Sequence, residues 1–365
     1  MSDDAALIPH GSVAAGSGST ISLEMRVPGS PRLAIIITCW NYADYVTDAI
    51  ESVLKQARRD CELVVIDDGS TDNSWVEINR TGVRAYRMAN AGQRLACLRG
   101  LQETTAPFVL FLDADDELLP GAFSEILSRL DENVAKLQFP LLRMDTQRKV
   151  ISGPIPPLSD FREREILARD VLKTGSYTSP PTSGNVFRRD VCQLIEGADY
   201  ERAVDGVILF VAPFMGDIVS LSKPLGLYRV HDRNDSCFSE ELNPIPLKRE
   251  AERFEHRLEH LRRLLNEKGL GSRLVTADRA YFHQERSFYL AIANSARVGL
   301  RQFLFLLSLL WTYPYSAKVK LSMTLFFALT FVLSSERAKS VVNYRMQAHR
   351  RSAAGLVKAI FRRKR

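Results

Sequence analysis

The sequence of 365 residues has few cysteines, and no two of them have the spacing of a metal or redox motif. A disulfide framework or a zinc site would need paired or closely spaced cysteines. The number of cysteines is odd, and they are scattered along the chain: Cys39, Cys61, Cys97, Cys192 and Cys237. We therefore expect reduced thiols in a cytoplasmic protein.

Long apolar runs are also missing. About 20 consecutive apolar residues are needed to cross a bilayer, and the most apolar stretches, 303–311 and 321–333, are shorter. The first residues, 1–31, are rich in Ser, Gly and Ala and lack the basic and apolar segments of a signal peptide. We expect this segment to be disordered.

A net positive charge is missing outside the C-terminal tail. The whole chain has a net charge of +6, but residues 336–365 hold ten Lys/Arg and one Glu. The remainder has 49 − 10 = 39 basic and 43 − 1 = 42 acidic residues, a net charge of −3. A body that binds nucleic acid would carry a basic face of its own, and the tail has few aromatic residues to stack on bases. We expect no nucleic acid partner.

The most informative stretch that is present is an apolar run followed by carboxylates. Residues 108–112 predict a buried, parallel strand, and Asp113, Asp115 and Asp116 follow it. Crowded carboxylates repel one another and are costly to bury unpaired. A Mg²⁺ or Mn²⁺ ion that also contacts substrate phosphates would neutralise them. The alternative is that these acids only cap the next helix.

Polar residues also follow the other predicted strands. The pattern predicts a strand at 33–38, a helix at 44–56 and a strand at 63–66, which is the beginning of a parallel sheet with right-handed crossovers. Ligands of such sheets bind beyond the carboxyl ends of the strands. We therefore expect Thr38, Asp68 and Asp113 to converge at one edge.

Further elements are predicted along the chain. A Pro-rich loop is expected at 151–158 and a Pro/Gly-rich loop at 178–185. The apolar stripe of a helix at 248–268 is expected to pack on the body of the protein or on a partner. The other expected elements are strands at 85–87, 136–143 and 224–231 and helices ending at Leu101 and spanning 122–130.

From Leu33 to about Ser236 the chain resembles the family 2 glycosyltransferases of GT-A fold. Six motifs in order carry this resemblance. They are Ile-Ile-Ile-Thr-Cys-Trp-Asn-Tyr (35–42), Val-Val-Ile-Asp-Asp-Gly-Ser-Thr-Asp (64–72), Asn-Ala-Gly-Gln (90–93), Phe-Leu-Asp-Ala-Asp-Asp (111–116), Thr-Ser-Gly-Asn-Val-Phe (182–187) and Tyr-Arg-Val-His (228–231).

The resemblance implies a mixed, mainly parallel α/β sheet flanked by helices, and an enzyme that moves a sugar from a nucleoside diphosphate donor to an acceptor hydroxyl. It implies that Thr38 and Asp68 hold the nucleoside base and that Asp113 approaches the ribose or the donor sugar. The expected donor-binding residues also include Asn41, Gly92, Arg94 and Ala114.

The resemblance further implies a Mn²⁺ or Mg²⁺ ion on the donor diphosphate. Asp115 would ligate this ion, which neutralises the leaving diphosphate, and His231 would complete its shell or bind the diphosphate. The alternative for His231 is a structural histidine at a strand end. The donor would be a UDP-, GDP- or TDP-sugar, and the acceptor a glycan or a lipid-linked sugar.

An inverting transfer needs a general base, and the resemblance implies Asp205, with Asp199 and Glu201 as nearby alternatives; Asp205 could also cap the helix that begins near Val207. Two positions depart from the family pattern. Val204 replaces the usual Glu before the base, and Ala96-Cys97-Leu98 replaces Ala-Arg-Asn. Arg94 or Arg99 could compensate for the missing Arg.

These observations predict four regions: a disordered segment (1–31), a GT-A catalytic domain (32–240), a helical packing region (241–298), and apolar helices with a basic tail (299–365). The last region is expected to bind an anionic membrane surface at its cytoplasmic side. The alternative is a helical subdomain packed on the body with a solvated tail.

Two other functions compete with sugar transfer. One is an inactive scaffold that binds sugar nucleotides. This alternative stays open because Cys97 and Leu98 replace the Arg-Asn of the family pattern. A nucleotidyltransferase is the other, but it would carry a Gly-rich basic loop after the first strand, where this chain has Thr38-Cys-Trp-Asn-Tyr.

Overall fold

The computed structural model describes residues 30–204, 206, 208–231 and 242–346. Most of the segment 1–31 lies outside these residues, as do Asp205, Cys237 and the tail from residue 347. The four remaining cysteines are free thiols.

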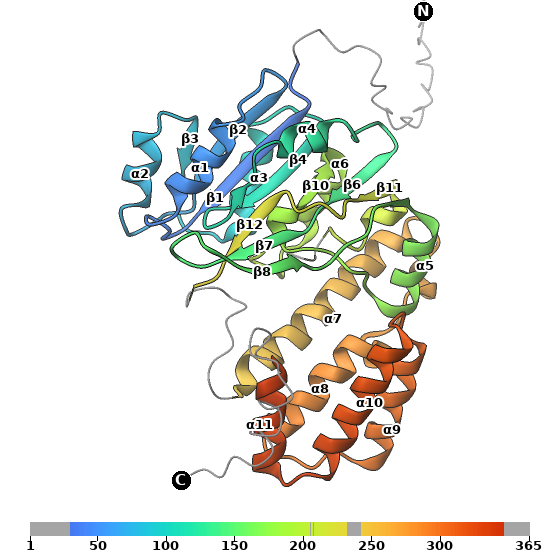
Figure 1. The fold of residues 1–365 in the computed structure, drawn as a ribbon. Coiled ribbons are helices and arrows are strands. Elements are labelled where there is room, and N and C mark those ends of the chain that lie inside the picture. The colour runs from blue at the N-terminus through green and yellow to red at the C-terminus, as the bar shows by residue number, and fades with distance from the viewer. Residues whose placement is uncertain (1–29, 205, 207, 232–241, 347–365) are drawn as a thin grey trace, which may run out of the picture.

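A mixed sheet of eight strands forms the centre of the catalytic domain (Figure 1). The strand order is β3-β2-β1-β4-β10-β6-β11-β9, and all strands except β10 and β9 run in one direction. The mainly parallel sheet predicted above is confirmed. Its strands are β1 (Leu33–Cys39), β2 (Cys61–Asp67), β3 (Ala85–Arg87), β4 (Phe108–Asp113), β6 (Val134–Gln138), β9 (Phe161–Glu163), β10 (Asn185–Arg188) and β11 (Asp217–Ser220).

Both faces of this sheet are buried, which explains the uninterrupted apolar runs of the central strands. Along β1, Ala34 and Ile36 point into one apolar core while Ile35 and Ile37 point into the other, as the two-residue period of a strand requires. Helices α1 and α4 contribute to the second core, and α3, α5, α6 and α7 contribute to the first.

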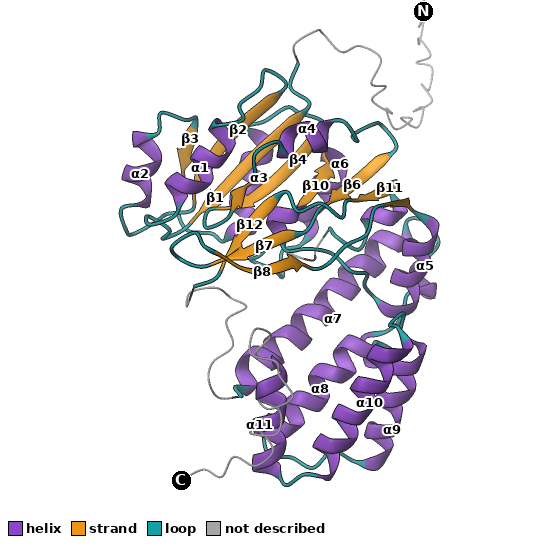
Figure 2. Cartoon of the chain, viewed as in Figure 1, coloured by secondary structure: helices purple, strands orange, loops and turns teal. Residues whose placement is uncertain are grey.

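The helices of this domain are short and lie on the two faces of the sheet (Figure 2). They are α1 (Val46–Leu54), α2 (Ser74–Arg80), α3 (Gln93–Gln102), α4 (Ala122–Leu127), α5 (Glu165–Thr174) and α6 (Arg189–Gln193), with 3₁₀ turns η1 (Thr182–Gly184), η2 (Leu194–Gly197) and η3 (Ala212–Phe214).

A second sheet of four strands corrects two predictions from the sequence. It has the order β5-β12-β7-β8, with β5 (Glu117–Leu118), β7 (Leu141–Met144), β8 (Val150–Ile155) and β12 (Gly226–Arg229). The single strand predicted at 136–143 is wrong, because β6 and β7 lie in different sheets. The loop predicted at 151–158 is partly wrong, because β8 is an edge strand, where proline is tolerated.

Helix α7 (Pro244–Asn266) joins the sheet domain to a C-terminal bundle. Its stripe Phe254, Leu258 and Leu261 packs into the core of the catalytic domain, whereas Leu247 near its start lies in the core of the bundle. The expectation that this stripe packs on the body is confirmed. Short 3₁₀ turns η4 (Gly271–Arg273) and η5 (Ala277–Arg279) follow α7.

The bundle consists of helices joined by short connections, so that successive helices are antiparallel. They are α8 (Tyr281–Ala293), α9 (Leu300–Thr312), α10 (Ala317–Val332) and α11 (Ser335–Met346). The expected C-terminal helical region is therefore present. Among the residues described, no helix combines the length and the hydropathy that crossing a bilayer requires.

Candidate active site

The polar residues predicted to converge do lie at one edge of the large sheet. Parallel pairing places Thr38 of β1 opposite Asp113 of β4 and Cys39 opposite Asp67 of β2. Asp68 continues β2 at the same edge, and its backbone N–H donates to Cys39 O at 2.8 Å. The strand ends therefore deliver three polar residues to one place, as parallel strands in register require.

Asp68 holds the loop that carries Gly92. Its two carboxylate oxygens accept hydrogen bonds from the backbone N–H groups of Ala91 and Gly92, both at 2.8 Å. Gly92 has φ = +94°, and a Cβ there would approach the Arg202 side chain to 3.0 Å. A glycine is needed at this position. Asp68 is 3% exposed, so in this structure it orders the edge of the site.

Asn41 has a similar ordering role at the next loop. It adopts φ = +60°, a conformation in which Asn is enriched. Its Oδ1 accepts from the backbone N–H of Thr71 at 2.8 Å, and its own N–H donates to Ser70 Oγ at 2.9 Å. Asn41 thus joins the end of β1 to the turn that follows β2.

Asp113 is linked to two other segments of the site. Its Oδ1 accepts from Gln93 Nε2 at 2.6 Å, and its backbone N–H donates to Ser183 Oγ at 3.1 Å. Gln93 Oε1 in turn accepts from the backbone N–H of Val204 at 3.2 Å. Gln93 therefore ties the end of β4 to the residue that precedes Asp205, while Asp205 itself lies outside the described residues.

Asp115 and His231 form a close, buried pair. His231 Nε2 lies 2.9 Å from Asp115 Oδ2, and the residues are 8% and 6% exposed. The imidazole stacks on Tyr45, with ring centroids 5.2 Å apart. Two neighbouring ligands of an octahedral Mg²⁺ with bonds of about 2.1 Å are about 3 Å apart. The spacing of this pair matches that distance, and it is also the length of the hydrogen bond that joins the two side chains.

Asp115 and His231 would supply only two ligands of a bound metal ion, so the substrate and water would supply the others. Among the residues described, no cluster of three or more His, Cys, Asp or Glu side chains could hold a metal ion by itself. Mg²⁺ is commonly held by one or two carboxylates together with substrate phosphates. The donor set here agrees with an ion that binds together with a diphosphate.

The next two acids, Asp116 and Glu117, bond to other groups of the protein. Asp116 is fully buried, and its carboxylate accepts from Ser183 Oγ at 2.6 Å and from the backbone N–H of Arg229 at 3.0 Å. Burial and the neighbouring Asp115 carboxylate raise the pKa of Asp116 well above its ordinary value. A carboxyl that is this buried and already bonded is a poor metal ligand.

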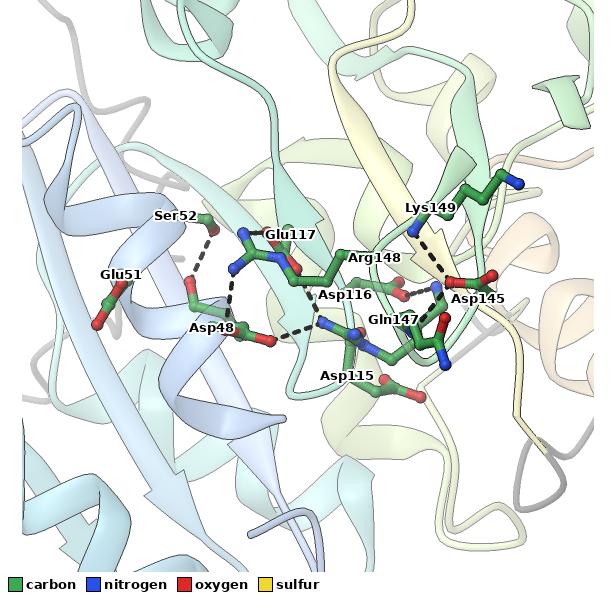
Figure 3. Close-up of polar contacts among 12 residues, drawn as sticks. Asp48, Glu51, Ser52, Asp115, Asp116, Glu117, Asp145, Gln147, Arg148 and Lys149 are labelled. Atoms are coloured by element: carbon green, nitrogen blue, oxygen red, sulfur yellow. Dashed lines mark hydrogen bonds and ion pairs between the residues drawn. The ribbon is translucent and has the colours of Figure 1, made fainter. Parts of the chain in front are cut away.

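Glu117 belongs to an ion-pair network between α1, β5, β12 and the β7–β8 turn (Figure 3). Its two oxygens accept from Arg229 Nη2 at 2.8 Å and from Arg148 Nη2 at 2.6 Å. The two guanidinium groups also meet Asp48, at 3.0 Å and 3.2 Å. Arg229 is 1% exposed. It is the last residue of β12 and lies two residues before His231 in the sequence.

The Arg94 side chain is bonded to backbone carbonyls of the protein. Its guanidinium donates to the carbonyls of Glu201 at 3.0 Å and of Ile195 and Glu196 at 3.2 Å. It thus anchors η2 and the following turn, and its contact with the donor stays a prediction. Ala114 is 1% exposed, so only its backbone could approach a ligand.

The two alternatives to Asp205 differ in their surroundings. Asp199 is exposed. Glu201 is 5% exposed, and its Oε2 lies 3.4 Å from Arg253 Nε and 3.3 Å from Arg257 Nη2, both on α7. These two ion pairs hold the Glu201 side chain against α7.

Three roles were missed from the sequence. Ser183 links the backbone of Asp113 to the carboxyl of Asp116, Gln93 bridges Asp113 to Val204, and Arg229 binds Glu117 and Asp48. For Arg229 a signal was present, because residues 229 and 231 share one face of the strand predicted at 224–231; the observed β12 ends at Arg229. The contacts of Ser183 and Gln93 depend on tertiary packing that no local pattern encodes.

Comparisons with known proteins agree with this geometry. The family described as Glycosyl transferase family 2 matches residues 34–191. An uncharacterized glycosyltransferase of Nostoc sp. is 35% identical over 218 residues, which are 56% of this chain and 66% of the relative. The GalNAc(5)-diNAcBac-PP-undecaprenol beta-1,3-glucosyltransferase of Campylobacter jejuni is 30% identical over 115 residues, which are 29% of this chain and 36% of the relative.

The chain thus covers less than two thirds of the length of these relatives. Among solved structures, S. aureus TarS 1–349 in complex with UDP is 17% identical, with a TM-score of 0.46 over 90% of this chain and 89% of that chain.

Proposed function

We propose that this protein, whose residues 34–191 match glycosyl transferase family 2, transfers a sugar from a nucleoside diphosphate donor to an acceptor hydroxyl with inversion. The observation that carries the proposal is the Asp115–His231 pair at the carboxyl edge of the sheet, with a 2.9 Å spacing that fits a divalent ion. Asp113 lies at the same edge, at the end of β4.

The donor diphosphate would bind beside Asp115 and His231. A bound Mg²⁺ or Mn²⁺ would neutralise charge on the leaving diphosphate. Thr38, Asn41, Asp68, Gly92 and Ala114 would form the nucleoside side of the pocket, chiefly through the two loops that Asp68 and Asn41 order.

Asp205 would act as the general base. It would take the proton of the acceptor hydroxyl as the oxygen attacks the anomeric carbon and as the bond from that carbon to the diphosphate breaks. The hydrogen bond from the backbone N–H of Val204 to Gln93, which also binds Asp113, supports a base close to the donor sugar. A single displacement of this kind inverts the anomeric configuration.

The acceptor would be a glycan or a lipid-linked sugar, and the reaction would take place at the cytoplasmic face of a membrane. The name of the Campylobacter relative, whose acceptor is linked to undecaprenyl diphosphate, supports a lipid-linked acceptor. The four free cysteines support a reducing compartment.

A thermal-shift screen tests the donor site. The nucleotides UDP, GDP and TDP and their sugars are added with Mn²⁺, Mg²⁺ or EDTA to the wild type and to Asp115→Ala, with the exposed Asp190→Ala as a matched control. A ligand at 100 times its Kd adds about 2.7 kcal/mol to the free energy of unfolding. We expect a metal-dependent shift for one nucleotide series that Asp115→Ala loses and Asp190→Ala keeps.

The absence of any shift would contradict the donor site. Turnover then separates an enzyme from a binding scaffold. We expect transfer or donor hydrolysis to fall by about 10²-fold or more in Asp205→Asn, with the thermal shift retained. A wild-type protein that binds the donor but releases no nucleoside diphosphate would be a scaffold.

A further inference from the structure

Helices α9 and α10 are apolar on both of their faces. Their inner faces form the core of the bundle, where Phe303 stacks on Phe331 with ring centroids 4.4 Å apart. Their outer faces carry large apolar side chains that are between 39% and 76% exposed. These are Leu300, Leu304, Phe305, Trp311, Leu321, Leu325 and Val332.

This outer face is unusual for the molecule. Residues 300–332 hold more than half of the exposed large apolar side chains among the residues described. Scattered apolar residues are normal on a protein surface, whereas a contiguous patch marks a binding site. The indole of Trp311 donates to Thr324 Oγ1 at 3.1 Å, so the exposed parts of α9 and α10 border each other.

The charges around this face have one sign. The sequence has no Asp or Glu between Glu285 and Glu336. Arg297 and Arg301 lie at the end where α9 begins, and Lys318 and Lys320 lie at the opposite end, where α10 begins. Cations therefore flank the apolar face at both ends.

Aromatic residues with a polar group lie at the Lys318 end. Trp311 is 51% exposed and Tyr315 is 41% exposed. Such side chains are enriched at the interface between lipid and water. Lys320 reaches back to the Trp311 carbonyl, with an Nζ–O distance of 2.9 Å.

We propose that the outer face of α9 and α10 binds the surface of a membrane that contains anionic phospholipids. The helices lie in the plane of the interface, since about 20 Å and 24 Å of helix are too short for a hydrocarbon core of about 30 Å. The apolar side chains enter the lipid, and the flanking Arg and Lys residues meet the head groups. This surface is separate from the proposed sugar transfer and does not depend on it.

Charge decides between the possible occupants of this face. A second copy of the chain would bring two cationic faces together, and the tail after residue 346 contains seven Lys or Arg and no acid. The cations beside the apolar face would repel a second copy of the chain and the basic tail, whereas they would attract anionic lipid head groups.

Vesicle binding of the full-length protein tests the proposal. Vesicles of phosphatidylglycerol and phosphatidylcholine are compared with vesicles of phosphatidylcholine alone, for the wild type, for Leu304→Glu/Leu325→Glu, and for Ile166→Glu. Ile166 is 48% exposed on α5 and serves as the matched control. We expect the double variant to bind at least about tenfold more weakly, because it loses the transfer of two exposed leucine side chains from water into lipid. We expect Ile166→Glu to bind like the wild type.

Trp311 supplies a readout of contact with lipid. We expect brominated lipid to quench the tryptophan fluorescence of the wild type more strongly than that of the folded double variant. The quenching should be lost in Trp311→Phe, which keeps Trp40 and Trp75. Unchanged vesicle binding by the double variant would overturn the proposal in favour of the tail. A wild-type dimer that the double variant converts to a monomer, without vesicle binding by either, would overturn it in favour of self-association.

Discussion

Arg229 shows how a single buried cation can hold the candidate site together. It bonds to Glu117, to Asp48 and to the carbonyl of Asp115, and its guanidinium lies 4.7 Å from the ring centroid of Tyr45. Because Tyr45 also stacks on His231, the position of the imidazole depends on this network.

We expect Arg229→Met to lower the free energy of unfolding by about 3 kcal/mol, because removal of one partner leaves the buried Glu117 carboxylate poorly compensated. The matched control is Arg162→Met, which removes the partner of Asp131 and Asp217 at the surface. Exposed ion pairs contribute about 1 kcal/mol or less. Urea unfolding measures both changes, and equal losses would show that burial of the network adds nothing.

Lys136 is a second buried cation, but it lacks a carboxylate partner among the residues described. Its Nζ bonds to Ser179 Oγ at 2.7 Å, to Gln138 Oε1 at 2.9 Å and to Tyr177 Oη at 3.2 Å. Burial lowers the pKa of Lys136 well below the usual lysine value. Between the lowered pKa and the unfolded value of about 10.4, the unfolded chain binds more protons than the folded protein.

The free energy of unfolding should therefore rise with pH in this window, by up to about 1.4 kcal/mol per pH unit. Lys136→Met should lack this rise. Urea unfolding between pH 7 and pH 9.5 tests the difference, with Lys223→Met, an exposed lysine that pairs with Glu125, as the control. Parallel pH profiles for the wild type and Lys136→Met would contradict the prediction.

At the scale of elements, the contact between α5 and α7 fixes the helix that leads to the bundle. Gly175 ends α5 with φ = +80°, and a Cβ there would lie 2.9 Å from Leu258 and 3.0 Å from Phe254 on α7. Gly82 has a similar φ of +71°, but a Cβ there would meet nothing within 4 Å.

We expect Gly82→Ala to cost about 1 kcal/mol from backbone strain and Gly175→Ala to cost a further 1–2 kcal/mol, roughly, from the clash with α7. Leu258→Ala opens space, so Gly175→Ala should cost no more than Gly82→Ala in that background. Chemical denaturation of the wild type, the three single variants and Gly175→Ala/Leu258→Ala measures this coupling. If the two glycine substitutions cost the same in the wild-type background, α7 is not tightly docked.

Elements with a clear period could be predicted from the sequence, and elements defined by long-range pairing could not. The runs that became β1, β2 and β4 end in polar residues, so the edge with Thr38, Asp68 and Asp113 followed from strand direction alone. The division between β6 and β7 at Phe139 and Pro140 could not be seen, because an apolar run contains no sign that its halves join different sheets.

In the candidate site, too, some features could be predicted from the sequence and others could not. The Asp115–His231 pair was expected from family motifs, whereas the use of Asp116 and Glu117 by Ser183 and Arg229 was not. The four carboxylates within residues 113–117 look alike in sequence, and only the packing of β12 and η1 decides which of them remain available to a ligand.

For the whole molecule, the distribution of charge separates two contributions to membrane binding. The chain has a net charge of +6, and residues 347–365 contribute +7 of it, so a protein that ends at Met346 has a net charge of −1. Basic residues near an anionic surface contribute about 1 kcal/mol each, and salt screens them. The insertion of apolar side chains is much less sensitive to salt.

We therefore expect the protein without residues 347–365 to bind anionic vesicles more weakly at low salt than the full-length chain, and to lose little further affinity as salt is raised. The Leu304→Glu/Leu325→Glu variant should behave in the opposite way, with residual binding that disappears at about 0.5 M salt, where the Debye length is only a few ångström. Co-sedimentation over a salt series measures both. If the truncated protein keeps the steep salt dependence of the full chain, the cations that flank α9 and α10 carry the electrostatic part of binding, and the tail has another role.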